Sequence, residues 1–307
     1  MRHLATAAAL ALFPVLAAAA DGLDWAYPVT PRPEPLDTLV LKQVPGSERA
    51  YTQAQIDDAF NPPDWFPDEH PAMPPIVARG EKPAVRACAQ CHLPSGDGHP
   101  ESSSLAGLPV PYLLRQLTAF KNGERKGVRA TTMITIAQAI SDADARAASE
   151  YFASLKPGLW TEVVETETVP KTFVGAGGMR FVAPGDEQEP IGNRIIVLPQ
   201  EETRAKSRDP HSGFVDYVPP GSIARGEALI TTGDGGKTIP CVICHGQTLQ
   251  EVPAIAGRPP TYIVRQLNDM KTGARSGIST ALMKAVVEKL SVEDMVAIAA
   301  YLGSRDP

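Results

Sequence analysis

The sequence lacks any run of lysine and arginine, and its formal net charge at pH 7 is −6. It therefore has no basic stretch of the kind by which nucleic-acid binders are recognised, and we expect no nucleic-acid partner. After residue 20 the sequence also lacks an apolar stretch long enough to cross a bilayer, so we expect no transmembrane span in the mature chain. The 307 residues, 43% of them hydrophobic, suffice for two ordinary domains with separate cores.

The N-terminus has the pattern of a secretory signal peptide. Arg2 is followed by the apolar run Leu4–Ala20, and Ala18 and Ala20 fit a small-residue cleavage site. The alternative is an uncleaved membrane anchor, but this run is short against the roughly 20 residues that a span needs. We therefore predict that residues 1–20 are a cleaved signal peptide and that the protein is periplasmic.

Cysteine is scarce, and all four cysteines fall in two Cys-x-x-Cys-His motifs. These are Cys88, Cys91 and His92, and Cys241, Cys244 and His245. Two thiols at this spacing on an opening helical turn face the same way, so each can form a thioether with one vinyl group of a porphyrin. The histidine that follows can point its imidazole at the iron. The motifs predict two covalently attached haem c groups.

Three other uses of these cysteines are open. The pairs could be thioredoxin-like redox dithiols, halves of a four-cysteine zinc site, or structural disulfides. None of these uses requires a histidine directly after both pairs, whereas haem attachment does. Two copies of the motif behind an export signal therefore favour haem.

One segment recurs 150 positions later. Residues 106–117, AGLPVPYLLRQL, correspond to residues 256–267, AGRPPTYIVRQL. The correspondence continues without a gap through Lys121 and Lys271, Gly123 and Gly273, Arg125 and Arg275, Gly127 and Gly277, Ser141 and Ser291, Asp144 and Asp294, and Tyr151 and Tyr301. The chain therefore carries a duplicated domain.

The repeat also indicates a second axial ligand for each iron. An electron-transfer haem with six ligands commonly takes Met or His in this position. Met133 and Met283 are the only methionines that coincide under the repeat, whereas the four histidines outside the motifs have no partners there. A methionine that fills a gap in the core is the alternative. We predict that His92 and Met133 bind one iron, and that His245 and Met283 bind the other.

Local patterns predict one small helical domain around each motif. Segments 78–81 and 224–227 both read Ala-Arg-Gly-Glu and correspond to a first helix, in which Gly80 and Gly226 would allow close helix packing. A helix begins near Pro109 or Pro259, and a Gly-containing turn, a methionine loop and a last helix follow. Ser141 and Ser291 are expected to cap that last helix, which contains Tyr151 or Tyr301.

Both repeats resemble class I cytochrome c domains, and the tandem resembles the dihaem cytochrome c4 and c553 group. The resemblance implies a mainly α fold with two tandem cytochrome c domains, at residues 74–157 and 222–307, here called the first and second repeat. It also implies that a backbone carbonyl accepts a hydrogen bond from each haem-binding histidine. Pro253 suits this role in the second repeat, whereas Ser103 stands at the position in the first. By the same resemblance, the residues that pack on haem or contact its propionates would be Tyr112, Arg115, Tyr262 and Arg265, with ordinary helix packing as the alternative.

Two segments have no counterpart in that resemblance. Residues 21–73 form an N-terminal arm rich in proline and aromatic residues, with a strand-like run at Thr38–Leu41. We expect this arm to pack on a haem domain, with docking of a partner as the alternative. Residues 158–221 are expected to form a small connector with strands near 162–164, 180–182 and 194–198, which fixes the placement of the two domains. Partner recognition through Asp209–Phe214 is the alternative.

With both irons bound by His and Met, no coordination position is open for a substrate. The sequence thus predicts an electron-transfer protein rather than an enzyme, which passes single electrons between a dehydrogenase or quinol-oxidising complex and a terminal oxidase or reductase. One alternative is a tightly bound cytochrome subunit of an oxidoreductase complex. Another is a dihaem redox enzyme, although a peroxidase needs an iron that can open, and the cysteine-ligated sulfur-oxidising type needs a spare cysteine that this chain lacks.

Overall fold

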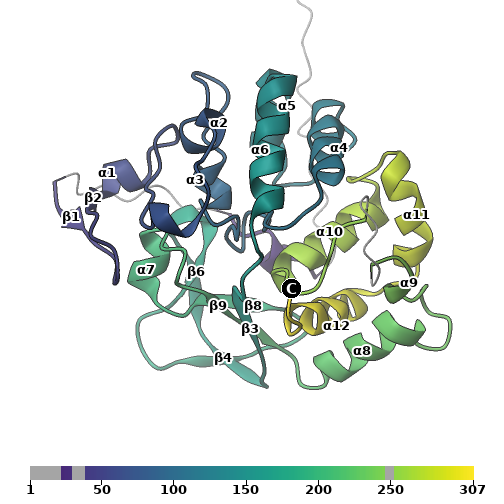
Figure 1. The fold of residues 1–307 in the computed structure, drawn as a ribbon. Helices are drawn as coiled ribbons and strands as arrows, with labels where there is room; N and C mark the ends of the chain where they lie inside the picture. Colours follow the sequence, from purple (N-terminus) through teal and green to yellow (C-terminus); the bar gives the residue numbers. More distant parts are fainter. Residues whose placement is uncertain (1–21, 30–38, 246–251) are drawn as a thin grey trace, which may run out of the picture.

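The fold is known from a computed structural model, which describes residues 22–29, 39–245 and 252–307. Within these ranges most of the regular structure is helical, and there are four small sheets (Figure 1). No helix within these three ranges is long and apolar enough to cross a membrane. The predicted signal peptide lies outside the described residues.

The first repeat is helical. Its helices are α2 (Pro75–Ala78), α3 (Ala89–His92), α4 (Val110–Lys121), α5 (Thr131–Ala139) and α6 (Asp142–Ser154). Pro109 is the N-cap of α4, as predicted, and Pro111 lies in the first turn, where a helix does not need its N–H group. Ser141 caps α6, since its hydroxyl accepts a hydrogen bond from the Asp144 N–H at 3.1 Å. The apolar faces of these helices share one core that includes Leu113 and Phe152.

The second repeat follows the same order. Its helices are α8 (Ser222–Thr232), α9 (Val242–His245), α10 (Pro260–Thr272), α11 (Ile278–Val287) and α12 (Val292–Gly303). Pro259 is the N-cap of α10, which ends at Gly273 with a φ of +78°. Ser291 and Asp294 form a complete capping box at the start of α12. The predicted order of helices is therefore present in both repeats.

Two local predictions are wrong. Met133 and Met283 lie inside α5 and α11 rather than in loops. Gly226 does lie in α8, where an added Cβ would stand 2.0 Å from the carbonyl oxygen of Ala297 in α12, so it permits the close crossing. Gly80 instead follows α2 in a turn with a φ of +64°. Its role is to allow this backbone geometry, which L residues rarely adopt, and the close approach of residues 85–87, since an added Cβ would stand 2.2 Å from the Val85 carbonyl oxygen.

The connector contains more strands than the sequence predicts. They are β3 (Thr161–Glu165), β4 (Thr168–Pro170), β5 (Thr172–Val174), β6 (Arg180–Val182), β7 (Gln188–Pro190), β8 (Ile196–Pro199) and β9 (Phe214–Val218), with the short helix α7 (Glu202–Lys206). Strand β9 is central in a three-stranded sheet, parallel to β3 and antiparallel to β8. The sequence does not predict β9, because the charged residue Asp216 occupies an inward position and so interrupts the alternation of apolar and polar residues expected of a strand.

The connector shares its core with the second repeat. Trp160, Phe181 and Phe214 belong to the same buried cluster as Val264 of α10 and Ala299 of α12. Figure 1 accordingly shows the sheet lying against α12. The connector is therefore part of the second globular unit and not a separable linker.

The segment 209–214 is used inside the molecule. Asp209, Ser212 and Phe214 are each no more than 2% exposed. The exposed His211 ring stacks on Phe66 of the arm at 4.0 Å between centroids and contacts Glu69 at 2.6 Å. This burial does not support the suggested recognition surface.

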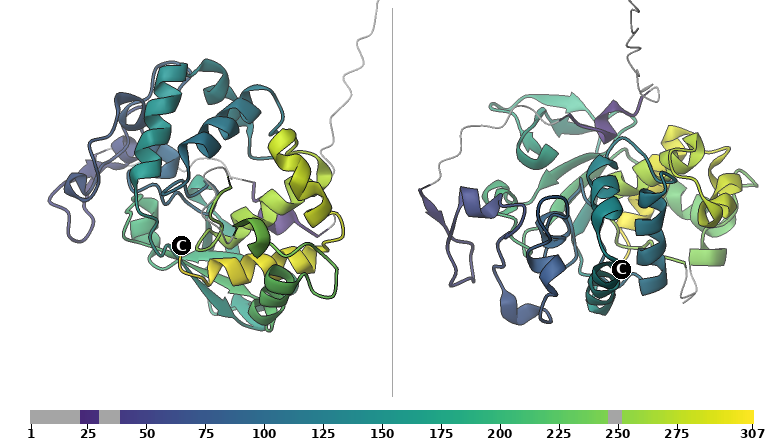
Figure 2. Two further views of the ribbon diagram at one scale, coloured as in Figure 1. Left: turned by 45° about the vertical axis from the view of Figure 1, so that its right-hand side comes forward. Right: turned by 90° about the horizontal axis from the view of Figure 1, so that it is seen from above.

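The N-terminal arm packs against the rest of the chain, as expected. Its elements are η1 (Asp24–Ala26), β1 (Leu41–Lys42), β2 (Tyr51–Thr52), α1 (Gln53–Ile56) and η2 (Pro67–Glu69). Trp65 Nε1 donates to the Ser207 carbonyl at 2.8 Å, and η1 lies against α10 (purple in Figure 2). Of the predicted strand run only Leu41 lies in a strand, and Thr38 lies outside the described residues.

Candidate haem-binding sites

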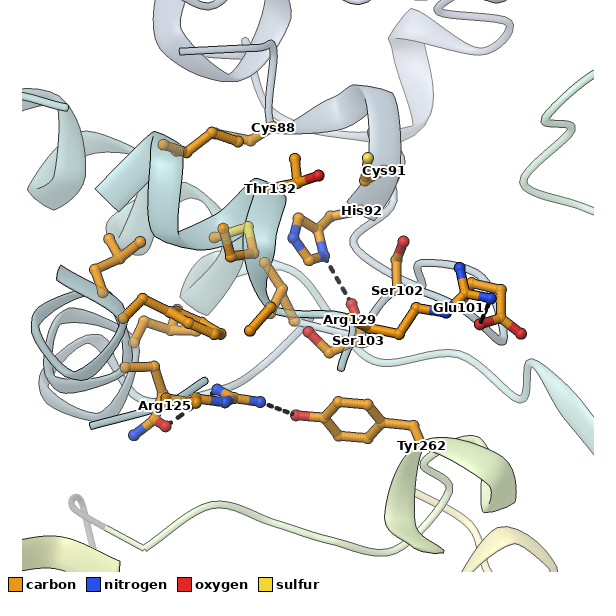
Figure 3. Close-up of a pocket in the computed structure, with 18 of the residues that line it drawn as sticks. Cys88, Cys91, His92, Glu101, Ser102, Ser103, Arg125, Arg129, Thr132 and Tyr262 are labelled. Carbon is orange, nitrogen blue, oxygen red and sulfur yellow. Dashed lines mark hydrogen bonds and ion pairs between the residues drawn. The ribbon is translucent and has the colours of Figure 1, made fainter. Parts of the chain in front are cut away.

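A cavity of about 470 Å³ lies in the first repeat, at its junction with the second. Cys88, Cys91 and His92, at or next to α3, line it together with Met133 of α5. Figure 3 shows the two cysteines and His92 around this space. The fold thus brings the two thiols, the imidazole and the thioether that the sequence singles out to one cavity.

The hydrogen bond of each motif histidine defines its tautomer. His92 Nδ1 lies 2.8 Å from the Ser103 carbonyl oxygen, and His245 Nδ1 lies 2.9 Å from that of Pro253. Because a carbonyl can only accept, each Nδ1 carries the hydrogen and each Nε2 keeps a lone pair free for a metal. Burial lowers the pKa of both histidines, which favours the neutral, ligating form. The carbonyl contacts expected from the resemblance are therefore present.

The environment of the cysteines disfavours the other uses considered for them. Burial raises the pKa of Cys88 to about 12 and that of Cys241 to about 11, whereas a reactive dithiol needs a lowered pKa. Cys88 packs on the core of the first repeat and Cys241 on that of the second, and all four cysteines are free thiols. Within the described part of the chain, no group of three or more His, Cys, Asp or Glu side chains is placed to hold a metal ion.

The walls of the first cavity are apolar, and one edge is positively charged. Helices α4, α5 and α6 contribute apolar side chains such as Leu113, Ile136 and Phe152. At the edge, Glu101 lies 3.2 Å from both Arg129 of the first repeat and Arg265 of the second. The cavity thus suits a large apolar group with acidic substituents on one side.

Two arginines that sequence reasoning did not propose for the site contact tyrosines of the cavity lining, and one of them, Arg125, lines the cavity itself. Arg125 donates to Tyr262 Oη at 2.9 Å (Figure 3), and Arg275 donates to Tyr112 Oη at 3.2 Å. They are two of the residues that coincide under the repeat, which is the signal that could have found them. Their position could not have been predicted, because nothing in the sequence shows which surfaces of the two repeats meet.

Of the two tyrosines and two arginines predicted to contact haem, three line the first cavity and one does not. Tyr112, Tyr262 and Arg265 line the first cavity, although the last two belong to the second repeat. Arg265 donates to the carbonyl of Ala26 at 3.0 Å and also to that of Pro100. Arg115 lies on α4 and is not part of the cavity lining. Contact of these four residues with haem stays a prediction.

The second motif is described in part. Cys241, Cys244 and His245 lie at or within α9, and the following residues 246–251 lie outside the described ranges. Met283 of α11 is half-buried and packs on the core of the second repeat, as Met133 does on that of the first. The environment of the predicted methionine ligand is thus similar in the two repeats.

Comparison with known proteins agrees with this arrangement. The cytochrome c family profile matches residues 77–156. Cytochrome c-554(548) of Halomonas halodenitrificans is 34% identical over 90 residues, which are 28% of this chain and 99% of that protein. The chain belongs to the cytochrome c family.

Two longer relatives span both repeats of this cytochrome. The thiosulfate dehydrogenase electron acceptor of Thiomonas intermedia is 27% identical over 231 residues, which cover 73% of this chain and 80% of the relative. Cytochrome c4 of Pseudomonas aeruginosa is 26% identical over 234 residues, which cover 74% of this chain and 87% of the relative. The match thus extends well beyond a single motif.

Membership of the family implies covalently bound haem c and a role in electron transfer. The described residues fit that group. The cavity has an apolar wall, both thiols and an imidazole with a free Nε2, and the guanidinium groups at its edge exceed the carboxylates. Haem carries acidic propionates, which would neutralise such an excess of positive charge.

Proposed function

We propose that the protein is a periplasmic dihaem cytochrome that carries single electrons from a dehydrogenase or quinol-oxidising complex to a terminal oxidase or reductase. The main support is that each repeat has the same donor set. A motif histidine with a free Nε2, two thiols and a methionine occur in both repeats in the same order. The two domains would be residues 74–157 and 222–307, joined by the connector and preceded by the arm.

The residue roles follow from the geometry of the first cavity. Cys88 and Cys91 would form the two thioethers, and His92 Nε2 and Met133 would be the protein ligands of the iron. Bound haem supplies the one-electron Fe(III)/Fe(II) couple. The apolar walls exclude water and the two protein ligands leave no open position, so the site favours electron transfer over substrate binding. Cys241, Cys244, His245 and Met283 would have the corresponding roles.

Attachment is tested by counting covalent haem after denaturation, using mass spectrometry and haem staining of protein matured in a bacterial periplasm. The wild-type chain should carry two haems and begin at Asp21. Replacement of Cys88 and Cys91 together by Ala should leave one haem, and so should replacement of Cys241 and Cys244. The control Met295→Leu changes a core methionine without a counterpart in the repeat and should keep two haems. Two haems in either double-cysteine variant would contradict the assignment.

A tightly bound subunit of an oxidoreductase complex is the second candidate. It is favoured by the relatives from Thiomonas intermedia and Stutzerimonas stutzeri, whose names describe electron acceptors of thiosulfate dehydrogenase. We propose on this basis that the electron donor is a dehydrogenase. Purification from native periplasm separates the candidates, because a subunit should co-elute with a dehydrogenase in fixed ratio, whereas a free carrier should elute alone.

A further inference from the structure

The two repeats meet through a cluster of six polar residues that form three pairs 150 positions apart. We call this cluster the arginine bridge, and it consists of Tyr112, Gln116, Arg125, Tyr262, Gln266 and Arg275. Arg125 donates to Tyr262 Oη at 2.9 Å and to Gln266 Oε1 at 2.8 Å. In mirror fashion, Arg275 donates to Tyr112 Oη at 3.2 Å and to Gln116 Oε1 at 2.8 Å. Gln116 also accepts from Arg125 at 3.1 Å, and Gln266 also accepts from Arg275 at 3.0 Å, so each arginine is held by side chains of both repeats.

The backbone fixes this exchange. Arg125 and Arg275 form an isolated antiparallel bridge between the turns that follow α4 and α10. Lys126 N donates to the Ala274 carbonyl at 2.8 Å, and Ser276 N donates to the Glu124 carbonyl at 2.6 Å. The two guanidinium groups therefore belong to residues whose backbones are paired. If one of the two turns moves, the other should move with it.

The charges of the bridge are not balanced by its own members. All hydrogen-bond partners given above are neutral amide or hydroxyl groups, and within the described ranges neither arginine forms an ion pair with a carboxylate. Asp269 lies within the field of both guanidinium groups, but it forms no ion pair with either of them in the described ranges. A cation that is withdrawn from water without a counter-ion is costly, so the bridge is built to face an anion.

Arg125 faces the site of its own repeat, because it lines the same cavity as His92. Arg275 is its counterpart under the repeat and is bound to Tyr112, which also lines that cavity. A guanidinium group that lines one site and is also held by side chains of the other repeat links the two repeats physically.

We propose that the arginine bridge raises and couples the reduction potentials of the two predicted haem sites, with Arg125 and Arg275 as positioning residues for the acidic edge of the group in their own repeat. This inference rests on the proposed function. Reduction adds one electron to Fe(III) to give Fe(II), with the electron supplied by a redox partner or a chemical reductant. A nearby cation favours the form that carries the extra negative charge, so its loss lowers the potential.

The test is an optical redox titration of the periplasmically matured protein, with dithionite as reductant, for the wild type and single variants. Arg125→Gln should lower the equilibrium constant for reduction of the first site about tenfold, equivalent to 59 mV for one electron, and lower that of the second site by a smaller factor. Arg275→Gln should show the reverse order. Arg125→Lys, which keeps the charge, should recover most of the loss.

Coupling is tested by the double variant and by a neutral change. The shifts in Arg125→Gln/Arg275→Gln should not add, because Gln116 and Gln266 each accept hydrogen bonds from both arginines. Tyr262→Phe removes a hydrogen bond to Arg125 without altering charge and should lower the potential of the first site by a smaller factor. Arg146→Gln is the matched control, since Arg146 is an exposed arginine of α6, and it should leave both potentials unchanged.

Unchanged potentials in Arg125→Gln and Arg275→Gln would overturn the proposal, and additive shifts in the double variant would overturn the coupling. Haem count and the low-spin spectrum are recorded first for every variant. A wild-type chain without two haems defeats the proposed function itself, whereas two haems with unaltered potentials in the variants defeat only the bridge.

Discussion

Met133 and Met283 are half-buried at matching points of α5 and α11, and each packs on the core of its own repeat. Replacement of either by Ala should abolish the weak charge-transfer band of a sulfur-ligated low-spin haem at that site only. It should also lower the potential there and open the iron to added ligands such as imidazole. Optical spectra of the oxidised variants, with and without imidazole, check this result.

The control for this experiment is Met295→Leu in α12. Met295 is 2% exposed and therefore equally able to perturb a core, but it has no methionine partner under the repeat. Its spectrum should stay that of the wild type. If Met133→Ala also keeps the wild-type band, Met133 is a core residue and not a ligand.

Asp294 is a buried carboxylate whose charge is compensated within the second repeat. Arg225 Nη2 lies 2.5 Å and Lys237 Nζ 2.7 Å from its oxygens, and Ser291 donates two further hydrogen bonds. Burial alone would raise the pKa of Asp294, but these hydrogen bonds together hold it below its usual range. The resulting stability is present above the unfolded pKa of about 3.9 and is lost as the pH falls through the folded value.

Asp294→Asn should therefore lower the free energy of unfolding at pH 7 by about 2 kcal/mol, with a smaller difference from wild type in strong acid. Asp144→Asn is the natural comparison, since Asp144 is the counterpart in the first repeat and its carboxylate, within the described part of the chain, accepts a hydrogen bond only from the Ser141 hydroxyl. It should cost about 0.5 kcal/mol. Urea unfolding of both variants at several pH values measures the difference, and equal losses would contradict the account.

At the scale of elements, the crossing of α8 and α12 depends on Gly226. An added Cβ would stand 2.0 Å from the Ala297 carbonyl oxygen. Because this oxygen belongs to the backbone of α12, it cannot move aside as the end of a flexible side chain can. Gly226→Ala should lower the free energy of unfolding by about 3 kcal/mol. Thermal unfolding followed by circular dichroism measures this effect.

Glu227→Ala is the control on the same helix, because Glu227 is the exposed neighbour of Gly226. It should change stability by no more than about 0.5 kcal/mol. A Gly226→Ala protein as stable as this control would mean that α8 and α12 can separate without loss.

The helices were predictable where a local signal marks their ends. Pro109 and Pro259 begin α4 and α10, and Ser141 and Ser291 cap α6 and α12, all through short-range stereochemistry. The first helix of the first repeat is predicted wrongly, because the Ala-Arg-Gly-Glu pattern lies within α8 in the second repeat but at the end of α2 and beyond it in the first. Before the first motif it lies among prolines, which confine α2 to Pro75–Ala78 and leave Gly80 in a turn.

At the scale of the whole molecule, the donor sets were predictable and their surroundings were not. The Cys-x-x-Cys-His spacing and the repeat point to the thiols, histidines and methionines without knowledge of tertiary structure. Hydrophobic periodicity predicts local elements and does not show which distant elements meet. It therefore predicts neither the pairing of β3 with β9, about fifty residues later, nor the contacts of the arginine bridge. Tyr262 and Arg265 show the consequence, since they line the cavity of the other repeat.

The arm and connector bind the two repeats into one body. Trp65 of the arm hydrogen-bonds Ser207 of the connector, and Arg208 of the connector donates to the Gln90 carbonyl inside the first motif at 2.6 Å. Because the connector also supplies core residues to the second repeat, both predicted sites have a common scaffold. Such a scaffold suits rapid electron exchange between fixed centres.

The most direct test of the central claim is an optical redox titration of the exported wild-type protein, combined with a count of covalent haem per chain. The account predicts two covalent haems, both low-spin with His/Met spectra, that titrate as one-electron centres and do not bind added imidazole. One haem per chain, or a high-spin haem open to added ligands, would contradict the carrier and favour a redox enzyme.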